Sequence, residues 1–566
     1  MARRVLALAS LLSSTHALSL LPNDTHLFFD FDGIVAAPNL TVSLGAVYKE
    51  QIPAIIPEFP WEAALHFYTC AVAVPAGTVA GGAAAEFRLY YGCYVAGGPM
   101  YVCLAASADG VVWKKPLLSA FPFNGSATNR VFLVNASSPG SWAGSVFIDS
   151  RAGVPASERF KLTYEGAGGE RLLFLATSPD GVAWFRRAPE APIIPTRLFS
   201  DTQTAMVWDA RRGRYLVFGR ADDALPGNTT QGCPGAYPSL RRVMLAVSNA
   251  SAEGPFSAPT QVLGPGAPDS PACLDVYNAA PIAVPGGLLL LPASYLHFAA
   301  AAAVPPPLPN ATANDGILDV RLASSRDGAS FSFVSRDAFI ERGVGYRLPA
   351  AAGGAFAAAD SDPDAGFVFS TAGGLLDAEL LAPEAAAARA PTPPLPFYAP
   401  PSKVGLLYFG AQRTHGGSAH PGPFQGVLRA TLRREGWAGL RSPQDPTGAG
   451  AFTTSPLAVP HPAEACGAPG AQLWLLLNAA TSVAGGVAVT LLDAATMAPL
   501  PNFSAPLPFT GNAVRWPAAW APASGGGGPN RDLGALAGTS VVARVALVHA
   551  QLFAWEVQCV AAGAQV

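Results

Sequence analysis

Charged residues are scarce in this chain. They make up 13% of its 566 residues, against about 25% in a typical soluble protein. The 35 Lys and Arg residues balance 38 Asp and Glu residues, so there is no basic excess for binding phosphates. Disordered chains are rich in charge and poor in apolar residues, whereas half of this chain is apolar. The composition therefore excludes a largely disordered chain and argues against a nucleic-acid partner.

Long apolar runs are also lacking beyond the N-terminus. The best candidate, residues 288–304, is interrupted by Pro292, Ser294 and His297. A membrane-spanning helix needs about 20 apolar residues, so no membrane span is expected. Glycine (58 residues) and proline (54 residues) are instead abundant, which favours short strands and turns over long helices.

The N-terminus has the features of a secretory signal. Arg3 and Arg4 precede an apolar segment at residues 5–12, and small residues near Ala17 and Ser19 suit cleavage. We expect residues 1–19 to be a signal peptide and the protein to be secreted. Eight Asn-x-Ser/Thr sequons agree with secretion. They mark expected surface loops and glycosylation sites at Asn23, Asn39, Asn124, Asn135, Asn228, Asn249, Asn310 and Asn502.

Metal-binding cysteine patterns are missing. The seven cysteines include no CxxC pair and no Cys/His cluster, so no structural zinc site is expected. We expect no cofactor, and leave open a structural cation in a central channel. Cysteines in an oxidising compartment tend to pair, although spacing alone does not determine the connectivity. The favoured pairs are Cys93 with Cys103, Cys233 with Cys273 and Cys466 with Cys559, which leaves Cys70 odd.

One short motif recurs along the chain. Residues 107–113 (SADGVVW) and 178–184 (SPDGVAW) match at five of seven positions. A third copy lies at 325–331 (SRDGASF), and a fainter one at 434–437 (REGW). In such a turn we expect Asp to accept from backbone amides, Gly to take a positive φ, and the aromatic ring to pack between sheets. The recurrent Asp is therefore structural rather than catalytic.

Short apolar segments with partial alternation precede each copy and predict strands. Each unit is then three strands, the turn and a fourth strand. A further unit keeps the strand but has lost the Asp-Gly pair at residues 248–251 (SNAS). The resulting five units, about 70 residues apart, predict a five-bladed β-propeller over residues 20–443. A six-bladed sialidase-like propeller is the alternative, but its repeat has one residue between Asp and Gly. Beyond residue 443, strands expected at 473–477, 487–492 and 541–548 predict a C-terminal β-sandwich over 444–566, so the fold class is all-β.

At this point the sequence resembles secreted proteins of the glycoside hydrolase family 32/43 type. The resemblance spans about residues 25–555 and rests on residues 27–30 (LFFD), 60–62 (PWE), 201–203 (DTQ), 275–278 (DVYN) and 432–437 (LRREGW). It implies a five-bladed propeller whose relatives cleave or transfer glycosyl units of fructans, arabinans or xylans, with three acids converging at the propeller's mouth. The family 32 signature Trp-Asn-Asp-Pro-Asn-Gly is absent, so the resemblance does not extend to a specific fructanase or invertase.

Glycoside hydrolysis uses two carboxyl groups on either side of the scissile bond. We expect these where the innermost strands begin, because those strand ends meet at the central opening of a propeller. Four acids at such positions are the predicted catalytic residues: Glu62, Asp149, Asp201 and Asp275. The predicted substrate-binding residues are Trp61, Gln203, Arg220, Tyr277, Asn278 and Arg326. Arg241, His297 and Asp319 also lie near such ends, where we expect a solvated surface.

Serine-hydrolase and nucleotide chemistry have no support, because neither a Gly-x-Ser-x-Gly elbow nor a P-loop is present. The sequence therefore predicts a secreted carbohydrate-active protein, a glycosidase acting on an oligo- or polysaccharide with paired carboxylates. The alternative is a non-catalytic glycan-binding propeller that kept the fold and lost the acid. Two carboxyl groups about 5–10 Å apart in one pocket would favour the enzyme.

Overall fold

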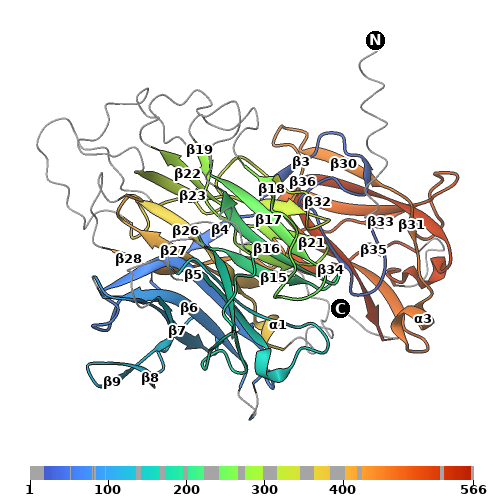
Figure 1. Ribbon diagram of the computed structural model, residues 1–566. Helices are drawn as coiled ribbons and strands as arrows, with labels where there is room; N and C mark the ends of the chain where they lie inside the picture. Colours follow the sequence, from blue (N-terminus) through green and yellow to red (C-terminus); the bar gives the residue numbers. More distant parts are fainter. Residues whose placement is uncertain are drawn as a thin grey trace, which may run out of the picture. The chain divides into compact units, whose positions relative to one another are not determined.

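The computed structural model describes residues 18–50, 52–79, 81, 84–95, 97–135, 142–165, 172–187, 189–194, 202–221, 241–264, 274–297, 315–343, 362–382, 402–416, 424–522 and 528–561. Regular structure in these ranges is almost entirely β-strand, with a few short helices, so the predicted all-β class is confirmed (Figure 1). Within the same ranges, no helix is both long and apolar enough to cross a membrane.

The chain divides into two compact units. The larger consists of Val47–Ala388 and Val404–Leu432, and the smaller of Met1–Ala46, Arg389–Lys403 and Arg433–Val566. This division differs from the boundaries expected at residues 20 and 443. N-terminal segments join the smaller unit because β1 (Thr25–Leu27), β2 (Ile34–Ala36) and β3 (Thr41–Leu44) pair with C-terminal strands.

In the described part of the larger unit, five sets of four hydrogen-bonded strands can be followed, here named sheets I to V. Sheet I contains β5 (Ala64–Val74), β6 (Glu86–Tyr94), β7 (Met100–Ser107) and β10 (Arg130–Asn135). Sheet II contains β11 (Val146–Ile148), β12 (Phe160–Glu165), β13 (Leu173–Ser178) and β14 (Phe185–Arg186). Sheet III contains β15 (Ala205–Asp209), β16 (Arg214–Ala221), β17 (Arg242–Ser248) and β18 (Thr260–Leu263).

Sheet IV contains β20 (Pro281–Val284), β21 (Gly287–Leu290), β24 (Ala323–Ser325) and β25 (Ser332–Phe333). Sheet V contains β26 (Phe367–Leu376), β27 (Lys403–Ala411), β28 (Gln425–Arg433) and β4 (Val47–Lys49). A ribbon of β19 (Leu274–Val276), β22 (Ala293–His297) and β23 (Gly316–Val320) joins β26 through one parallel pair, and β26 joins β5 through another. A hairpin of β8 (Leu118–Phe123) and β9 (Ser126–Thr128) extends from sheet I.

The recurrent motif forms the turn after the third strand of sheets I, II and IV. In each copy the Asp Oδ1 accepts hydrogen bonds from the amides two and three residues later, at 2.7–2.9 Å. The glycines have φ values of +65° to +73°, a conformation that side chains with a Cβ disfavour. The predicted roles of the Asp and Gly residues are confirmed.

These turns also contact the neighbouring sheet. On the turn of sheet II, the carbonyl of Gly181 accepts from the hydroxyl of Tyr90 in sheet I at 3.0 Å, and the carbonyl of Asp180 accepts from Arg88. The ring of Trp184 packs edge-on against Tyr90, at 6.2 Å between centroids. The turn of sheet IV contacts sheet III in a similar way: Arg214 donates to the carbonyl of Asp327, and Phe331 packs edge-on against Phe218 at 5.7 Å between centroids. Both turns thus join two sheets.

The first strands of the five sheets surround one cavity of about 320 Å³. Its walls are largely apolar and come from β5, β11, β15, β20 and β26, with Leu380 of helix α1 (Ala378–Leu381) at one side. These five strands are called the inner strands below. The free thiol of Cys70 lies in this wall, and burial raises its pKa from 9.0 to about 12, so the thiol stays protonated at neutral pH.

The smaller unit is built on two very long strands, β32 (Gln472–Asp493) and β36 (Ser540–Val560), shown in orange and red in Figure 1. The sequence predicts separate strands at 473–477 and 487–492, but both belong to β32. The intervening residues 482–485 bulge out opposite His549, between the pairs Thr481↔Ala550 and Gly486↔Val548. A bulge absorbs extra residues while the ladder continues on both sides.

Shorter strands complete this unit. They are β29 (Ala438–Arg441), β30 (Ala449–Thr454), β31 (Leu457–Ala458), β34 (Asn512–Pro517) and the pair β33 (Pro506–Leu507) with β35 (Ala519–Trp520). One apolar core receives alternate residues of both halves of β32 and of both halves of β36. Helix α3 (Pro462–Cys466) is anchored to β36 by a disulfide between Cys466 and Cys559.

A second disulfide joins Cys93 and Cys103 across β6 and β7. Both bonds are pairs that the sequence favours, while Cys233 and Cys273 lie outside the described residues. Five sequon asparagines are described with their side chains, and all are exposed: Asn23, Asn39, Asn124, Asn249 and Asn502. The side chain of Asn135, and all of Asn228 and Asn310, lie outside the described residues.

The packing of the turn predicts that one methyl group added at Gly181 destabilises the fold measurably. A Cβ at Gly181 would lie 2.5 Å from the Tyr90 hydroxyl oxygen, at a φ of +73°. We expect Gly181→Ala to lower the free energy of unfolding by about 2–4 kcal/mol, measured by urea denaturation. Gly213→Ala is the matched control, because Gly213 has a φ of +63° with no atom within 4 Å of the added Cβ. Equal losses in the two variants would show that the contact between sheets contributes nothing.

The Asp of the turn predicts a pH dependence. Partial burial disfavours the charged form, but the amides of Ser330 and Ala329 outweigh it and lower the pKa of Asp327 from 3.8 to about 2. Because the pKa is lower in the folded state, ionised Asp327 stabilises the fold above about pH 4, and this contribution is lost towards about pH 2. The difference in unfolding free energy between wild type and Asp327→Asn should therefore shrink over that range. A pH-independent difference would contradict this assignment.

Candidate functional site

A layer of buried, uncharged polar side chains lies where the inner strands begin. Thr69 on β5 and Thr371 on β26 face each other with 2.7 Å between their hydroxyl oxygens. Gln203, just before β15, donates from its side-chain amide to the carbonyl of Thr69. Asn278, before β20, donates to the hydroxyl of Ser370 at 3.4 Å. All five side chains are fully buried, so the predicted residues Gln203 and Asn278 belong to one internal layer.

Next to this layer two arginines flank one tyrosine ring. The guanidinium carbons of Arg220 and Arg241 lie 4.7 and 4.8 Å from the ring centroid of Tyr277. Arg241 also lies 5.0 Å from the ring of Tyr295. Arg220 is near the end of β16, and Arg241 directly precedes β17, so adjacent strands of sheet III present both cations to the ring. Desolvated cations over aromatic faces are attracted by the ring quadrupole.

Asp275 is the carboxylate of this cluster. On β19 it lies opposite Tyr295 of β22, and His297 two residues later is on the same face of the ribbon. The Asp275 Oδ2 atom is 2.8 Å from His297 Nε2 and 3.8 Å from Arg241 Nη1. Asp275 is only 2% exposed. A buried carboxylate needs such partners to remain charged.

A chain of hydroxyl and imidazole groups continues from the cluster. The Tyr277 hydroxyl is 3.2 Å from His415 Nε2, and the Tyr295 hydroxyl is 3.3 Å from His415 Nδ1. The hydroxyl of Tyr68 donates to that of Tyr277 at 3.4 Å. Burial raises the pKa of Tyr295 far above its usual value, so its phenol stays protonated. The site therefore combines the Asp275 carboxylate, two guanidinium groups, two imidazoles and three phenols. Together with Arg220 and Arg241, the residues Asp275, Tyr277, Tyr295, His297 and His415 are called the Asp275 cluster below.

Three of the predicted site residues are brought together in the cluster, namely Asp275, Tyr277 and Arg220. The predicted catalytic residue Asp201 lies outside the described residues. Its neighbour Thr202 is fully buried and donates from its hydroxyl to the carbonyl of Tyr277 at 3.4 Å.

Glu62 is not brought together with Asp275 but belongs to a separate buried network. Its Oε1 accepts from the Tyr91 hydroxyl at 2.6 Å, and its Oε2 forms a 2.8 Å ion pair with Lys115. The predicted sugar-binding residue Trp61 donates to the side chain of Asn129, which also contacts Glu62. The Oε2 atom of Glu62 also accepts from the amides of Glu58 and Phe59, which precede β5, so this carboxylate joins sheet I to the segment that leads into it.

Asp149 and Arg326 lie at the other end of the strands. Asp149 follows β11 and accepts from the hydroxyl of Tyr215 at 2.8 Å. Tyr215 and Arg220 are five residues apart on β16, which at about 3.3 Å per residue separates the two ends by roughly 16 Å. Arg326 belongs to the turn of sheet IV, where its carbonyl accepts from Arg212. Neither residue joins the Asp275 cluster.

Two residues expected at a solvated surface are buried instead. Arg241 and His297 are each 4% exposed and both contact Asp275. The expectation is wrong because the ribbon of β19, β22 and β23 encloses these strand ends. Tyr295 and His415 were not predicted at all. The only signal in the sequence is that Tyr295 and His297 alternate along β22 within an otherwise apolar run, which puts both on one face.

No metal site accompanies the cluster in the part of the chain that the structure describes. No three His, Cys, Asp or Glu side chains there are grouped closely enough to hold an ion. The available chemistry is that of a carboxylate beside guanidinium, imidazole and phenol groups: a carboxylate can take a proton, attack an electron-poor carbon, or bind hydroxyl groups.

Comparison with known proteins returns structural matches alone. No family model matches the chain. No curated protein matches it either. Solved structures that match are described as glycoside hydrolases. One of these covers 71% of this chain and 96% of its own, with 13% identity and a TM-score of 0.38. A Podospora anserina α-L-arabinofuranosidase covers 69% and 98%, with 11% identity and a TM-score of 0.37. A Bombyx mori GH32 β-fructofuranosidase covers 92% and 94%, with 10% identity and a TM-score of 0.33. These scores are too low to identify a family.

The contact between Asp275 and His297 predicts energetic coupling. Asp275→Asn removes the charge that His297 and Arg241 contact, and His297→Gln removes the imidazole. We expect a double-mutant cycle of unfolding free energies to give a coupling of about 0.5–3 kcal/mol. Additive effects of the two substitutions would mean that the 2.8 Å contact contributes no net stability. Urea denaturation followed by tryptophan fluorescence measures the unfolding free energies of the wild type, the two single variants and the double variant.

Proposed function

We propose that sheets I to V are the blades of a five-bladed β-propeller. Support comes from the one cavity that all five inner strands line. The turns supply further support, because those of sheets II and IV contact sheets I and III. A Cβ on Gly110 in the turn of sheet I would lie 3.0 Å from Leu376 of sheet V, as expected if the last blade meets the first. The strand β4, from the N-terminal side of the chain, would complete the last blade by pairing with β28.

For the smaller unit we propose a β-sandwich. The bulge at residues 482–485 interrupts β32 at mid-length, and both halves of β32 and β36 contribute to one apolar core. Long strands that pass from one sheet to the other give this arrangement.

The proposed function is that of a secreted carbohydrate-active enzyme, a glycoside hydrolase that acts on an oligo- or polysaccharide. The observation that carries it is Asp275: a buried carboxylate near the start of the inner strands, in contact with His297 and Arg241 and set beside the rings of Tyr277 and Tyr295. A carboxylate held in this way can act as the nucleophile or base of glycosyl cleavage. Guanidinium and phenol groups nearby can bind sugar hydroxyls.

In this mechanism Asp201 is the proposed second carboxyl group, the one that protonates the leaving oxygen. The argument is one of chain connectivity, since Thr202 contacts the backbone of Tyr277 and Asp201 is its direct neighbour. Arg220 and Tyr277 are assigned to hold the sugar that occupies the site. Gln203 and Asn278 would hold the layer beneath it. Exposed sequons and two disulfides fit the proposed passage through the secretory pathway.

The alternative function is glycan binding without cleavage. It is favoured by the contacts of two of the predicted acids: Glu62 forms an ion pair with Lys115, and Asp149 accepts a hydrogen bond from Tyr215. If Asp201 does not act, Asp275 lacks its proposed acid partner, and the cluster could bind a sugar without cleaving it by the proposed two-carboxylate route.

Hydrolysis of a glycan panel tests the proposal. The panel should include fructans, arabinans and xylans, and products can be detected by reducing-end analysis. We expect Asp275→Asn and Asp201→Asn each to lower kcat/KM by about 100- to 10,000-fold. The loss arises because an amide can neither take up nor release the catalytic proton.

Two further variants serve as matched controls for the same loss of a buried charge. Glu62→Gln and Asp149→Asn should lower the melting temperature but leave kcat/KM of the folded protein within a few-fold. Wild-type rates in the Asp275 variant would exclude this residue from the mechanism. Binding to the panel with no cleavage by the wild type would establish the alternative.

A further inference from the structure

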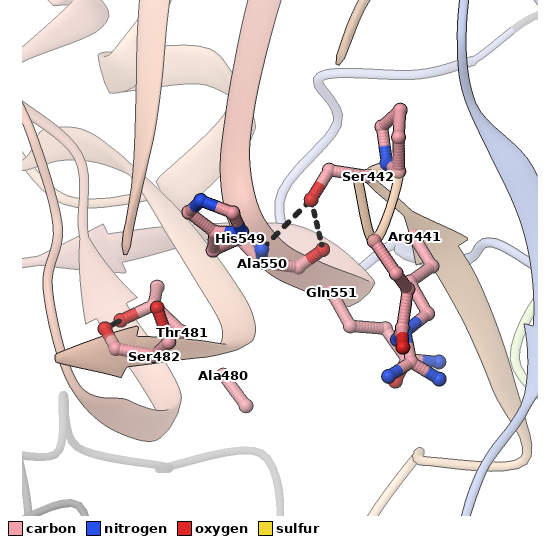
Figure 2. Close-up of a pocket in the computed structure, with 10 residues that line it drawn as sticks. Arg441, Ser442, Ala480, Thr481, Ser482, His549, Ala550 and Gln551 are labelled. Atoms are coloured by element: carbon pink, nitrogen blue, oxygen red, sulfur yellow. Dashed lines mark hydrogen bonds between the residues drawn. The ribbon is translucent and has the colours of Figure 1, made fainter. Parts of the chain in front are cut away.

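The smaller unit has a polar pocket of its own, shown in Figure 2. Its volume is about 390 Å³, within the range of about 300–1,000 Å³ found for small-molecule sites. Three segments of this unit line it: residues 441–444, 480–482 and 549–551. Nothing in the chemistry assigned to Asp275 requires this pocket, so its occupant has to be inferred from the lining itself.

The pocket exists because a strand ladder is interrupted. β36 is flanked by β32 along its length and by β29 at Leu552 and Gln551. In Figure 2, Thr481 and Ser482 lie on one side of His549 and Ala550, and Arg441 and Ser442 on the other. Residues 482–485 bulge away from the ladder opposite His549 alone, which opens the space between these side chains. Bulges often re-aim side chains next to functional sites.

Two unusual backbone positions keep the imidazole of His549 at this opening. His549 has a φ of +42°, a left-handed conformation that costs free energy for any residue other than glycine. Its amide donates to the carbonyl of Gly448 at 2.8 Å. A Cβ on Gly448 would lie 2.1 Å from the imidazole Cε1 atom, so only glycine leaves room for the ring. A glycine here would fit the left-handed backbone of residue 549 better than histidine, yet the chain carries histidine. Strain of this kind concentrates at ligand sites.

The lining divides into side chains that hold the walls and side chains that can contact a ligand. The hydroxyl of Ser442 bridges the amide and the carbonyl of Ala550, at 2.9 and 3.2 Å. The hydroxyl of Thr481 accepts from the amide of Gly511 and donates to the carbonyl of Ser482. These two residues are structural. The side-chain nitrogen of Gln551 donates to the carbonyl and the hydroxyl of Ser43, which leaves its oxygen for a ligand. The remaining polar groups of the lining are the guanidinium of Arg441, the side-chain amide of Gln444, the hydroxyl of Ser482 and the imidazole of His549.

We propose that this pocket binds one neutral sugar residue through its hydroxyl groups. Sugar hydroxyls both donate and accept, which suits a lining that mixes amide, hydroxyl, imidazole and guanidinium groups. The ten lining residues include no Asp or Glu, so the site is not built for a cation. They include no Phe, Tyr or Trp, so it is not built for a base that must stack. The single guanidinium lies against the side-chain amide of Gln444, which argues against a site specialised for anions.

Binding of simple glycosides to the full-length protein tests this assignment. All variants should carry Asp275→Asn, so that sugar held at the cluster is the same in each. The probes are the methyl glycosides of glucose, galactose, xylose and arabinose, with glucuronate and sulfate as the charged comparison. We expect one or more neutral glycosides to bind with a dissociation constant in the millimolar range, measured by ligand-observed NMR. His549→Gly should weaken that binding by at least about 10-fold.

Met497→Gly is the matched control, because Met497 also has a left-handed backbone, with a φ of +60°, in an exposed turn of the same unit. Both substitutions relieve backbone strain, so both variants should melt at or above the temperature of the parent. Only His549→Gly should lose sugar binding. Supporting evidence is thus a loss of binding without a loss of stability.

Three outcomes would overturn the proposal. Equal glycoside binding in the parent and in both variants would place the sugar elsewhere. Binding of sulfate or glucuronate without any neutral glycoside, or no binding at all, would exclude a neutral sugar as the ligand. A clearly lower melting temperature for His549→Gly would assign the imidazole to holding the fold. Because Asp275 is neutralised in every variant, none of these outcomes decides the chemistry proposed for the cluster.

Discussion

The larger unit depends on the way its turns join neighbouring sheets. A four-stranded sheet with two apolar faces is not stable alone and must bury both faces against other sheets. The Ser-x-Asp-Gly turn contributes to this burial in two ways. Its Asp and Gly residues hold a backbone shape without help from other sheets, and its carbonyls then accept hydrogen bonds from side chains such as Arg88, Tyr90 and Arg214. Where a turn has its full motif, local structure and sheet-to-sheet contact are provided by the same seven residues.

Joined sheets bring their first strands together, and this sets the chemistry at the strand ends. The interior of such an arrangement excludes water, so polar groups there must satisfy one another. Uncharged residues do so directly, as the layer of Thr69, Gln203 and Thr371 shows. A buried carboxylate also needs polar or cationic partners, and Asp275 contacts His297 and Arg241. The buried carboxylate and the groups around it are the reason why the cluster is the proposed site of function.

Sequence reasoning succeeded where a pattern acts over a few residues. For the turn at residues 178–184, the sequence predicts that Asp180 accepts from nearby backbone amides and that Gly181 has a positive φ, because both follow from neighbouring backbone. Strand positions and the disulfide between Cys93 and Cys103, which are 10 residues apart, were predicted for similar reasons. Prediction failed where a strand continues through an irregular segment, because the sequence does not show whether such a segment ends the strand or bulges out of it. The segment at residues 482–485 looked like a turn between two strands, but β36 pairs with both sides and turns it into a bulge.

The acids show most clearly which properties a linear chain encodes. That Glu62, Asp149 and Asp275 stand near strand ends follows from strand patterns, and so does the all-β class. Which of them remains available to a ligand does not follow, because it depends on partners up to about 66 residues away: Lys115 for Glu62, Tyr215 for Asp149, and Arg241 with His297 for Asp275. Strand periodicity is a short-range property of the backbone, whereas the pairing of buried charges is a property of the packed interior, and it exists once distant strands have met.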